Sequence, residues 1–541
     1  MGRVPRSPPR HSKEGSRLYG IVRYQHRELP YGTRSICPDC LLDRGELNIV
    51  DATVLEAEGR VLMRKTCPEH GDFEEVIWSD AALYRRSMER WYRSVGISNP
   101  GAASSNGCPL DCGLCPEHRS HTALALIDVT NRCNLSCPIC FASSNTAERI
   151  YEPSREEIRG MMATFRGSRP VPCPGIQFTG GEPTLCESLV DYVRWARELG
   201  FDHVMVATNG VRFAEDAGYV RRLVEAGLNT VYLQFDGVSE RPYLAARGVD
   251  LRDVKRRALD SCREAGLDGV ILVPTVVGGV NDGELGEIVR FGLENCDVVK
   301  CINFQPVSFT GRIDRRESMR VTISDVITLI EEQTGGLVEA EDWYPISSML
   351  PLGRALGLMK GVPEVELSAH PACGMATFLV LEDGEPRPIT DLVDMEGFLD
   401  ALEGVCDLYA GGSILAGLRS RLMLGGALRG VKGGLLGRLL GSLIDRGDYG
   451  SLASFMDGVL MLGMMHFMDP WNYDLERVSH CDIHYGTPDG GMVPFCNYNM
   501  FYREEVEGRH TRELKVPPLA PHADWTKEGF SFIRTHKRSN Q

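Results

Sequence analysis

The sequence lacks a long apolar run. None of its stretches reaches the roughly 18 to 20 uninterrupted apolar residues that a membrane-spanning helix needs. The first residues also lack the apolar core of a secretion signal. We therefore expect neither a membrane-spanning nor a secreted protein, but one that works in the cytoplasm.

Positive charge is scarce as well. The 541 residues include 59 Lys and Arg against 74 Asp and Glu, which gives a net charge of −15. General nucleic-acid binders need a basic surface to contact phosphates, so we expect no nucleic-acid partner. An apolar content of 43% with 25% charged residues is typical of a globular chain, here long enough for about two to four domains.

Cysteine, by contrast, is plentiful. The 18 cysteines stand in short arrays, and grouped thiols without an export signal indicate metal rather than disulfides. The first array, Cys37-x2-Cys40, is followed by two strand-like runs and by Cys67-x2-His70. This pattern is typical of a zinc-ribbon or rubredoxin-like domain, whose tetrahedral site suits one zinc or iron ion. These four residues are the predicted ligands, although a cysteine from elsewhere could replace His70.

A second array, Cys133-x3-Cys137-x2-Cys140, follows an apolar run at residues 122–128 that is typical of a buried strand. Three thiolates at this spacing can hold three irons of a [4Fe-4S] cube and leave the fourth iron without a protein ligand. A structural zinc knuckle is the alternative, but no fourth Cys or His follows soon after Cys140. We therefore predict a reactive cluster held by these three cysteines.

The segment Gly180-Gly181-Glu182-Pro183 supports this prediction because it ends another apolar strand. Glycines let a backbone approach a ligand closely, and a carboxylate at a strand end can accept from an ammonium group. Together with the cysteine triplet, the segment resembles the radical S-adenosylmethionine (SAM) superfamily, apart from Ile139 at a position that is usually aromatic. The resemblance implies that SAM binds at the cluster and that the glycine segment contacts its amino group.

An alternation of apolar runs and helical stretches after residue 124 predicts the fold. We expect strands at 124–129, 175–179, 203–208, 230–236, 270–277 and 298–305, and helices at 154–166, 187–199, 217–226, 251–265, 283–294 and 324–333. Six such units predict an α/β fold whose parallel sheet curves into a partial (β/α)6 barrel of the TIM type; a doubly wound sheet is the alternative. Ligands gather at the C-terminal ends of such strands. The candidates there to bind SAM are Gly180, Gly181, Glu182, Pro183, Thr208, Asn209, Gln234, Asp236 and Gln305.

Two further groups of cysteines remain. Cys108-x3-Cys112-x2-Cys115 repeats the spacing of the second array, but no strand precedes it and no second glycine segment exists. We predict an auxiliary [4Fe-4S] cluster there whose fourth ligand stays open, with His118 and His121 nearby. Cysteines far apart in sequence can also converge on one cluster. The candidates for a second auxiliary cluster are Cys373, Cys481 and Cys496, with Cys301 as the candidate fourth ligand.

Residues 409–446 reverse the acidic character of the chain, with ten glycines and six basic residues against one acidic residue. At about 100° per residue, one helix face collects Leu436, Leu439, Leu440, Leu443 and Ile444. Such a segment suits a helix on an anionic membrane surface, or an ordinary helix that covers the barrel. With the methionine-rich run at 459–468, it predicts an apolar substrate channel and a peripheral position on the inner membrane face.

The arrays and the shifts in composition divide the chain into six predicted parts. The barrel at 122–335 is the centre. Around it lie a disordered tail (1–17), a zinc-ribbon or rubredoxin-like domain (18–95), an auxiliary-cluster segment (96–121), a C-terminal auxiliary-cluster and lipid-binding region (336–506) and a polar tail (507–541).

Over nearly its whole length the chain is similar to the archaeal tetraether lipid synthase family of radical SAM enzymes. Besides the arrays, the similarity rests on Asn303-Phe-Gln-Pro-Val-x-Phe-Thr-Gly-Arg312, His466-Phe-Met-Asp469 and Pro494-Phe-Cys496-Asn-Tyr-Asn499. It implies an enzyme that joins the terminal carbons of isoprenoid diether lipids by an sp3–sp3 carbon bond, using a 5′-deoxyadenosyl radical twice. The implied partners are the diether lipid, a membrane surface and a low-potential electron donor such as ferredoxin.

Two other functions stay open at this point. A radical SAM methylase of a pterin or another small cofactor would not need the apolar, basic region. An iron–sulfur electron carrier, which is not an enzyme, would not need Gly180-Gly181-Glu182-Pro183. The predicted cofactors are one SAM-binding [4Fe-4S] cluster, two auxiliary clusters, SAM and one zinc or iron ion.

Overall fold

The computed structural model describes residues 20–24, 28–145, 150–315, 317–382, 384–413, 415–428, 431, 437, 441 and 455–512. The predicted tail at residues 1–17 lies outside this part of the chain, as do residues 513–541 of the predicted polar tail. The predicted amphipathic face of Leu436, Leu439, Leu440, Leu443 and Ile444 lies outside it too. Within the described residues, no helix is both long and apolar enough to cross a membrane.

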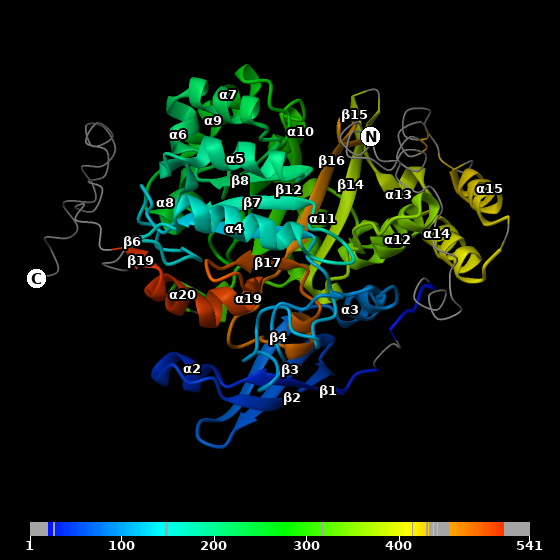
Figure 1. The fold of residues 1–541 in the computed structure, drawn as a ribbon, viewed down its shortest axis with the longest axis horizontal. Helices are drawn as coiled ribbons and strands as arrows, with labels where there is room; N and C mark the ends of the chain where they lie inside the picture. The colour runs from blue at the N-terminus through cyan, green and yellow to red at the C-terminus, as the bar shows by residue number, and fades with distance from the viewer. Residues whose placement is uncertain are drawn as a thin grey trace, which may run out of the picture.

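Four antiparallel strands near the N-terminus form a sheet of their own, at the bottom of Figure 1. They pair in chain order and are β1 (Tyr31–Ile36), β2 (Ile49–Ala57), β3 (Arg60–Cys67) and β4 (Gly71–Trp78). Buried and exposed side chains alternate along much of β2, as expected for a sheet that is covered on one face. The helix α2 (Pro38–Arg44) lies between β1 and β2, and α3 (Ala81–Met88) follows the sheet.

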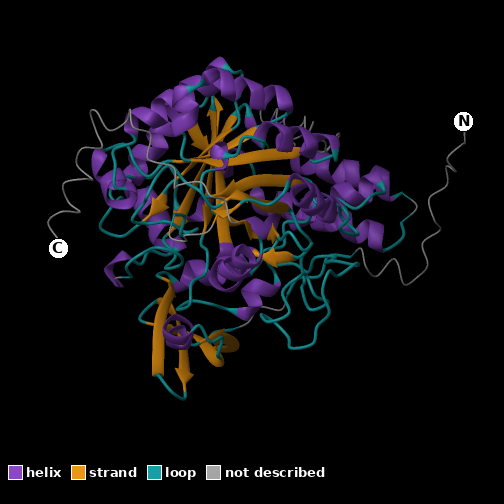
Figure 2. Cartoon of the chain, turned by 60° about the vertical axis from the view of Figure 1, so that its left-hand side comes forward, coloured by secondary structure: helices purple, strands orange, loops and turns teal. Residues whose placement is uncertain are grey.

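The middle of the chain forms the predicted barrel. Its six parallel strands lie side by side in chain order and are β5 (Leu124–Thr130), β7 (Gly175–Gly180), β8 (His203–Thr208), β9 (Thr230–Gln234), β10 (Val270–Val273) and β12 (Val299–Pro306). The helices that follow them are α4 (Arg155–Arg166), α5 (Leu189–Glu198), α7 (Ala217–Ala226), α9 (Arg252–Glu264), α10 (Leu285–Glu294) and α11 (Ile323–Thr334). Figure 2 shows these helices packed around the sheet. Each predicted strand and helix overlaps an observed one, so the predicted α/β barrel is confirmed.

Short elements complete this part of the chain and its surroundings. They are β6 (Ile150–Tyr151), α6 (Val211–Glu215), α8 (Glu240–Arg247), β11 (Thr275–Val276), β13 (Tyr344–Pro345), α18 (Leu475–Ser479), α19 (Phe495–Asn497), α20 (Arg503–Arg509) and β19 (Thr511–Arg512). Capping boxes at Ser154 and Thr322 begin α4 and α11, because each side chain accepts from the third backbone N–H of its helix. The main apolar core lies between the barrel sheet and the six barrel helices α4, α5, α7, α9, α10 and α11.

The C-terminal third extends both edges of the barrel sheet. At one edge β16 (Val459–Met465) pairs in parallel with β12, and β14 (Gly374–Glu382) continues the sheet with β15 (Glu385–Pro388). At the other edge β17 (Ile483–Gly486) pairs in parallel with β5 and carries β18 (Met492–Pro494). The methionine-rich run is therefore a mostly buried strand of the extended sheet.

A second, helical core lies beside β14 and β15. It is built by α12 (Leu350–Lys360), α13 (Ile389–Leu392), α14 (Met395–Ala410) and α15 (Ala416–Leu428). Leu399, Leu402 and Cys406 are fully buried where these helices meet. This core occupies part of the region predicted to bind lipid, and apolar side chains fill it.

Candidate functional site

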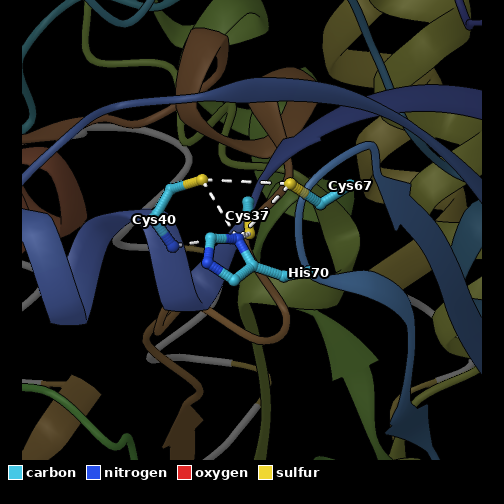
Figure 3. A group of neighbouring side chains, drawn as sticks. All are labelled: Cys37, Cys40, Cys67 and His70. Atoms are coloured by element: carbon cyan, nitrogen blue, oxygen red, sulfur yellow. Dashed lines mark hydrogen bonds between the residues drawn. The ribbon is translucent and has the colours of Figure 1, made fainter.

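The N-terminal domain built on β1–β4, called the ribbon from here on, brings together the four residues predicted to hold a metal ion (Figure 3). Cys37 caps α2 directly after β1, and Cys40 lies within α2. Cys67 ends β3, and His70 lies in the turn before β4. Their ligand atoms all lie within 4.8 Å of one another, and the three cysteines are buried.

The distances among these atoms fit a tetrahedral metal site. His70 Nδ1 lies 3.5, 3.4 and 3.6 Å from the sulfurs of the three cysteines, and the sulfurs of Cys40 and Cys67 are 3.8 Å apart. Metal bonds of about 2.3 Å to sulfur and about 2.0 Å to nitrogen give tetrahedral edges of about 3.8 Å between sulfurs and about 3.5 Å between sulfur and nitrogen. The donor set therefore fits one zinc or iron ion.

Hydrogen bonds prepare these thiols for metal binding. Asn48 Nδ2 donates to Cys40 Sγ at 3.4 Å and to Cys67 Sγ at 3.6 Å. Burial raises the pKa of Cys37 to about 11. Burial acts in the same direction on Cys67, but hydrogen bonds from backbone N–H groups outweigh it and lower the pKa of this thiol to about 6. Cys67 thus becomes a thiolate, the form that binds metal, more readily than Cys37.

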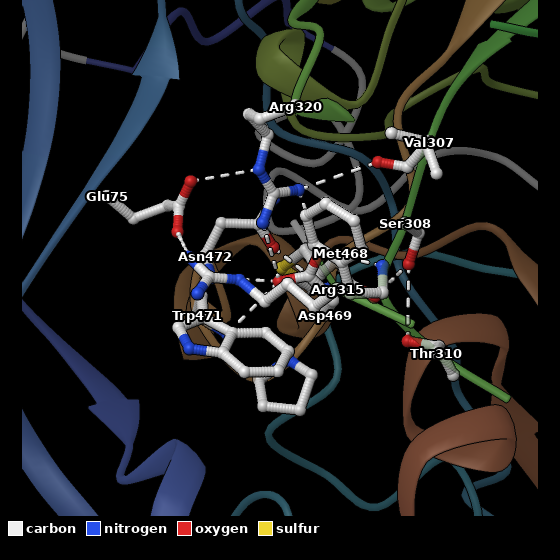
Figure 4. A network of polar contacts seen from close by, with 12 residues as sticks. Glu75, Val307, Ser308, Thr310, Arg315, Arg320, Met468, Asp469, Trp471 and Asn472 are labelled. Carbon is white, nitrogen blue, oxygen red and sulfur yellow. Dashed lines mark hydrogen bonds and ion pairs between the residues drawn. The ribbon is translucent and has the colours of Figure 1, made fainter. Parts of the chain in front are cut away.

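A buried polar network ties the ribbon to the rest of the molecule (Figure 4). Arg320, in the loop before α11, pairs with Glu75 of β4 at 2.9 Å and with Asp469 at 2.7 Å. Arg315 donates to the other oxygen of Glu75 at 2.9 Å. The Arg320 and Asp469 side chains are 7% and 0% exposed, so solvent does little to weaken this network. It joins β4 of the ribbon, the loop between β12 and α11, and the segment after β16 that contains Asp469.

The three central cysteines lie in one loop at the C-terminal end of β5, where Cys137 is buried and Cys133 and Cys140 are half-buried. Asn145 holds the first part of this loop. Its side-chain amide donates to the carbonyls of Cys133 at 2.8 Å and Leu135 at 2.9 Å, and its Oδ1 accepts from the Cys133 N–H at 3.1 Å. Three thiols in so short a loop fit the donor set of a [4Fe-4S] cluster with one open iron.

Arg312 holds the second part of the cluster loop. Its backbone makes two hydrogen bonds of 2.9 Å with Cys140. Its guanidinium donates to the carbonyls of Cys137 at 2.7 Å and Ser144 at 2.9 Å. Gly311 permits this approach, because a Cβ there would lie 2.5 Å from the Cys140 carbonyl oxygen. The end of the predicted 303–312 motif therefore shapes the cluster loop.

Gly180 and Gly181 pack against the start of the same loop. The N–H of Gly181 donates to the Thr130 carbonyl at 2.8 Å. A Cβ on Gly180 would lie 2.1 Å from that carbonyl oxygen, and one on Gly181 would lie 2.2 Å from the Arg132 carbonyl oxygen. Only glycine fits at both positions. The two glycines are thus required for backbone packing as well as for the predicted approach of a ligand.

Glu182 is 1% exposed, and its carboxylate accepts four hydrogen bonds. One oxygen accepts from the Thr184 N–H at 3.2 Å, the Thr184 hydroxyl at 2.6 Å and the Thr208 hydroxyl at 2.7 Å. The other accepts from the Asn209 N–H at 2.8 Å, and Asn209 Nδ2 donates to Asn134 of the cluster loop at 2.6 Å. Burial raises the pKa of Glu182, and these hydrogen bonds oppose the shift. Glu182 thus joins the glycine segment to the end of β8.

A buried ion pair lies after β9. Asp236 is fully buried and accepts from Arg247 at 2.6 and 2.7 Å. Arg247 also donates to the Ile139 carbonyl in the cluster loop at 2.8 Å. Arg247 therefore connects the buried carboxylate of Asp236 to the cluster loop.

A buried lysine connects two other predicted SAM residues. Lys255 Nζ donates to the Asn209 carbonyl at 2.6 Å and to Gln234 Oε1 at 3.0 Å. Burial lowers the pKa of Lys255 to about 7. The ends of β8 and β9 are thereby fixed relative to each other.

Gln305 lies on β12 and is paired within the barrel. Its Nε2 donates to the hydroxyl of Tyr232 at 2.7 Å, and Asn303 Nδ2 donates to the same hydroxyl at 2.5 Å. Burial raises the pKa of Tyr232. Gln305 therefore connects β12 to β9 across β10.

Cys108, Cys112 and Cys115 line a cavity of about 930 Å³ between their segment and the ribbon, where Arg34 forms part of the opposite wall. Asn497 Nδ2 donates to Cys112 Sγ at 2.9 Å. Burial raises the pKa of Cys108 to about 12 and of Cys112 to about 11. Three thiols beside a roomy cavity fit the predicted auxiliary cluster.

The two histidines near this array are buried and have other partners. His118 Nε2 lies 2.7 Å from the Cys481 carbonyl oxygen and 3.1 Å from His484 Nε2. His121 Nε2 accepts from the Glu366 N–H at 3.1 Å. His118 lines the same cavity as the three cysteines, but its Nε2 is already paired.

The distal cysteines Cys373 and Cys496 lie near Arg477, and Cys481 lies near Cys496. Arg477 Nε donates to Cys373 Sγ at 3.5 Å. Cys496 Sγ accepts from the Met468 N–H at 3.4 Å, and the pairing of His484 with Pro494 brings Cys481 and Cys496 to the same end of the β17–β18 pair. Burial raises the pKa of Cys496 to about 12. The structure thus brings together three cysteines that the sequence keeps far apart.

Cys301 does not join this group. It lies on β12 opposite Met461 of β16, whereas Gly374, next to Cys373, lies opposite Met465. Four residues along a strand amount to about 13 Å at about 3.3 Å per residue, farther than one cubane spans. The structure therefore corrects the prediction of Cys301 as the fourth ligand.

Three residues that organise the site were absent from the predicted set: Arg247, Lys255 and Arg312. Lys255 did have a signal, because it interrupts the buried stripe of α9 that includes Ala258 and Cys262. Arg312 is the last residue of the 303–312 motif, which carries the resemblance to the lipid synthase family. Arg247 ends α8 and has no periodic signal.

Comparisons with known proteins agree with this geometry. A sequence profile of the radical SAM superfamily matches residues 127–292, which include the cluster loop and the glycine segment. A profile described as the HMPTM N-terminal zinc ribbon domain matches residues 29–79, which include the four ribbon ligands. The predicted superfamily and the predicted ribbon domain are confirmed.

Three similar proteins illustrate the range of matches. A 7,8-dihydro-6-hydroxymethylpterin dimethyltransferase of Methanocaldococcus jannaschii is 45% identical over 496 residues, which cover 89% of this chain and 96% of the relative. A GTP 3′,8-cyclase of Thermodesulfovibrio yellowstonii is 26% identical over 219 residues, which cover 40% of this chain and 65% of that protein. Among solved structures, SuiB of Streptococcus suis bound to the precursor peptide SuiA covers 40% of this chain and 46% of its own, at 18% identity and a TM-score of 0.34.

The first of these relatives contradicts the predicted lipid-joining reaction. It matches nearly the whole chain, and its name describes methylation of a pterin. The tetraether lipid synthase prediction is therefore wrong, and the lipid substrate and membrane partner implied by it lose their basis. The motifs quoted for that resemblance instead shape the cluster loop, through Arg312, and the distal cysteine group, through Cys496.

Proposed function

Because the chain belongs to the 7,8-dihydro-6-hydroxymethylpterin dimethyltransferase family of radical SAM proteins, we propose that it methylates a 7,8-dihydropterin that carries a hydroxymethyl group at C6. The 45% identity over 89% of this chain carries most weight. A match limited to the barrel would suggest only a shared fold, but this one covers 89% of the chain and so extends well beyond the barrel.

The residues needed for the superfamily's cofactors are in the described chain. Its cofactors are a [4Fe-4S] cluster and SAM, and Cys133, Cys137 and Cys140 would hold the cluster. When bound, cluster and SAM supply a 5′-deoxyadenosyl radical that can remove a hydrogen atom from an unactivated carbon.

The residues at the strand ends would bind and orient SAM. Asn209 lies beside the cluster loop through its hydrogen bond to Asn134. Gln234 is held by Lys255, and Asp236 by Arg247. Side chains fixed by partners in this way keep a reactive geometry without reorganising when a ligand enters. Thr208 and Gln305 complete the proposed set.

The other metal sites would serve stability and electron supply. Four protein ligands close the ribbon site, which is the arrangement of structural metals. The Cys108 and Cys373 groups would hold two auxiliary clusters. Radical SAM enzymes use a one-electron reductant, and we propose a low-potential donor such as ferredoxin for this chain.

A reconstitution experiment tests the proposed reaction. The full chain is loaded anaerobically with iron and sulfide, then incubated with SAM, dithionite and 6-hydroxymethyl-7,8-dihydropterin. We expect 5′-deoxyadenosine together with pterin products heavier by one and by two methylene units, measured by mass spectrometry. SAM with a deuterated methyl group reports whether SAM donates the added methyl groups.

Two controls make the result specific. The Cys137→Ala variant should form neither 5′-deoxyadenosine nor methylated pterin, because it lacks one cluster ligand. GTP offered in place of the pterin should stay unchanged, since the similarity to the cyclases is confined to a minor part of the chain. Cleavage of SAM without any pterin product would refute the proposed substrate and leave the cofactor assignment intact.

A further inference from the structure

His466 is buried without a partner for either ring nitrogen. It is 2% exposed, and among the described residues neither Nδ1 nor Nε2 has a hydrogen-bond partner. An unpaired polar atom in a buried position costs about 1–3 kcal/mol, so such atoms are rare unless a water, an ion or a ligand satisfies them. The ring of His466 therefore needs an explanation.

The backbone of His466 fixes it beside the distal cysteines. Its N–H donates to the Cys373 carbonyl at 2.9 Å, because the chain leaves β16 where β14 begins. Its own carbonyl accepts from Arg477 Nη2 at 2.7 Å, and the same guanidinium donates to Cys373 Sγ. Two residues later, the Met468 N–H donates to Cys496 Sγ at 3.4 Å. His466 thus stands between two of the three converging cysteines.

Arg477 provides a second, independent observation. It is 6% exposed, and among the described residues it forms no ion pair with a carboxylate within 4 Å, although the buried carboxylate of Asp474 acts on it from farther away. A buried cation without a carboxylate is unfavourable unless another anion balances it. Its guanidinium donates to the thiol of Cys373, and three thiolates on an iron–sulfur cluster would provide that negative charge.

Other imidazoles near the group have partners. His480 hydrogen-bonds the Glu476 carbonyl and the Tyr24 hydroxyl, each at 2.8 Å. His484 hydrogen-bonds Thr122 and His118. With Cys301 about 13 Å away along the sheet, His466 is the remaining donor among these candidates.

We infer that His466 is the fourth protein ligand of an iron–sulfur cluster held by Cys373, Cys481 and Cys496, and that Arg477 is the buried counter-ion of this cluster. Four ligands leave no iron open, so substrate does not bind at an iron of this site. A neutral imidazole in place of a thiolate, together with Arg477, makes the cluster less negative and raises its reduction potential. This assignment does not depend on the pterin substrate.

Nitrogen spectroscopy on the reconstituted full chain tests this assignment. The ribbon is filled with zinc, which is silent in electron paramagnetic resonance, and the protein carries 15N-labelled histidine. We expect the reduced protein to show a histidine nitrogen coupling to a [4Fe-4S] signal. His466→Ala should lose that coupling and, on mild oxidation, give a [3Fe-4S] signal because one iron has lost its ligand.

His466→Cys separates ligation from a merely structural role. A thiolate restores four ligands, so we expect full iron content, no nitrogen coupling and a lower reduction potential than the wild type. Cys301→Ala and His118→Ala serve as matched controls and should keep the coupling. If His466→Ala fails to fold, loss of the coupling in His466→Cys identifies the ligand instead. A fully loaded wild type without nitrogen coupling, or with coupling that persists in His466→Ala, would overturn the assignment.

Discussion

The ribbon site and the barrel site hold their cysteines in different ways. In the ribbon, four ligand atoms lie within 4.8 Å of one another, and all come from residues 37–70. In the barrel, the loop of Cys133, Cys137 and Cys140 is shaped by distant residues, among them Arg247 and Arg312. The ribbon is a closed site formed by local turns. The barrel loop would leave one iron of its cluster without a protein ligand, and its shape depends on the surrounding fold.

This difference matches the two tasks that metals perform. A complete set of protein ligands stabilises a fold, and an incomplete set leaves room for a ligand that reacts. We therefore expect changes in the ribbon to affect stability first and changes around the barrel loop to affect chemistry first.

Removal of a cysteine should have the largest effect and should separate the two sites. Cys137→Ala is expected to lose the barrel cluster and to reduce SAM cleavage to background, while the ribbon metal remains. Cys40→Ala is expected to lose the ribbon metal and lower the melting temperature, because metal binding at such sites is folding free energy. Metal analysis, 5′-deoxyadenosine formation and thermal unfolding measure these effects. SAM cleavage that survives in Cys137→Ala would contradict the barrel assignment.

The connection between ribbon and barrel should come next. Arg320→Ala leaves Asp469 buried without its partner, and we expect a loss of about 3–5 kcal/mol in the free energy of unfolding. Arg64→Ala is the matched control, since Arg64 pairs with Glu74 on the exposed side of the ribbon, and it should cost less than about 1 kcal/mol. Denaturant unfolding measures both. Equal losses in the two variants would show that the buried network does not join the regions.

Two glycines offer a smaller and more local comparison. Gly180→Ala would push a Cβ to 2.1 Å from the Thr130 carbonyl oxygen, which should cost about 1–3 kcal/mol and weaken SAM binding as the cluster loop shifts. Gly71→Ala in the ribbon also has a positive φ, of 79°, but meets nothing within 4 Å. It should show only backbone strain of about 1–2 kcal/mol. Calorimetry of SAM binding distinguishes them, and unchanged binding in Gly180→Ala would argue against this packing.

The last expected effect is a pH dependence on the barrel side. The pKa of Lys255 is about 7 in the folded chain and 10.5 when exposed, so the unfolded chain binds more protons between these values. Stability should therefore rise from about pH 7 to about pH 10.5, by up to about 1.4 kcal/mol per pH unit from this group. Lys255→Met should flatten that rise in urea unfolding. Parallel pH profiles of variant and wild type would refute the burial effect.

Much of the fold could be predicted because its signals are local. The alternation of apolar strands with amphipathic helices gave all six βα units, and their chirality leaves few ways to connect them. The edge strands β14, β16 and β17 could not be placed, since their partners lie far away in the chain. The methionine-rich run could not be assigned to a strand, because strand and buried helix are hard to distinguish in a short apolar segment.

The sequence by itself determined which residues can bind metal, because cysteine spacing within one loop or hairpin limits the chemistry that the loop can perform. It also determined the superfamily through the cysteine triplet and Gly180-Gly181-Glu182-Pro183. Only the tertiary structure decided that Cys373, Cys481 and Cys496 meet, that Cys301 stays apart, and that Arg312 shapes the cluster loop. Such contacts depend on which strands pair at the sheet edges, a choice made by the packing of the whole chain.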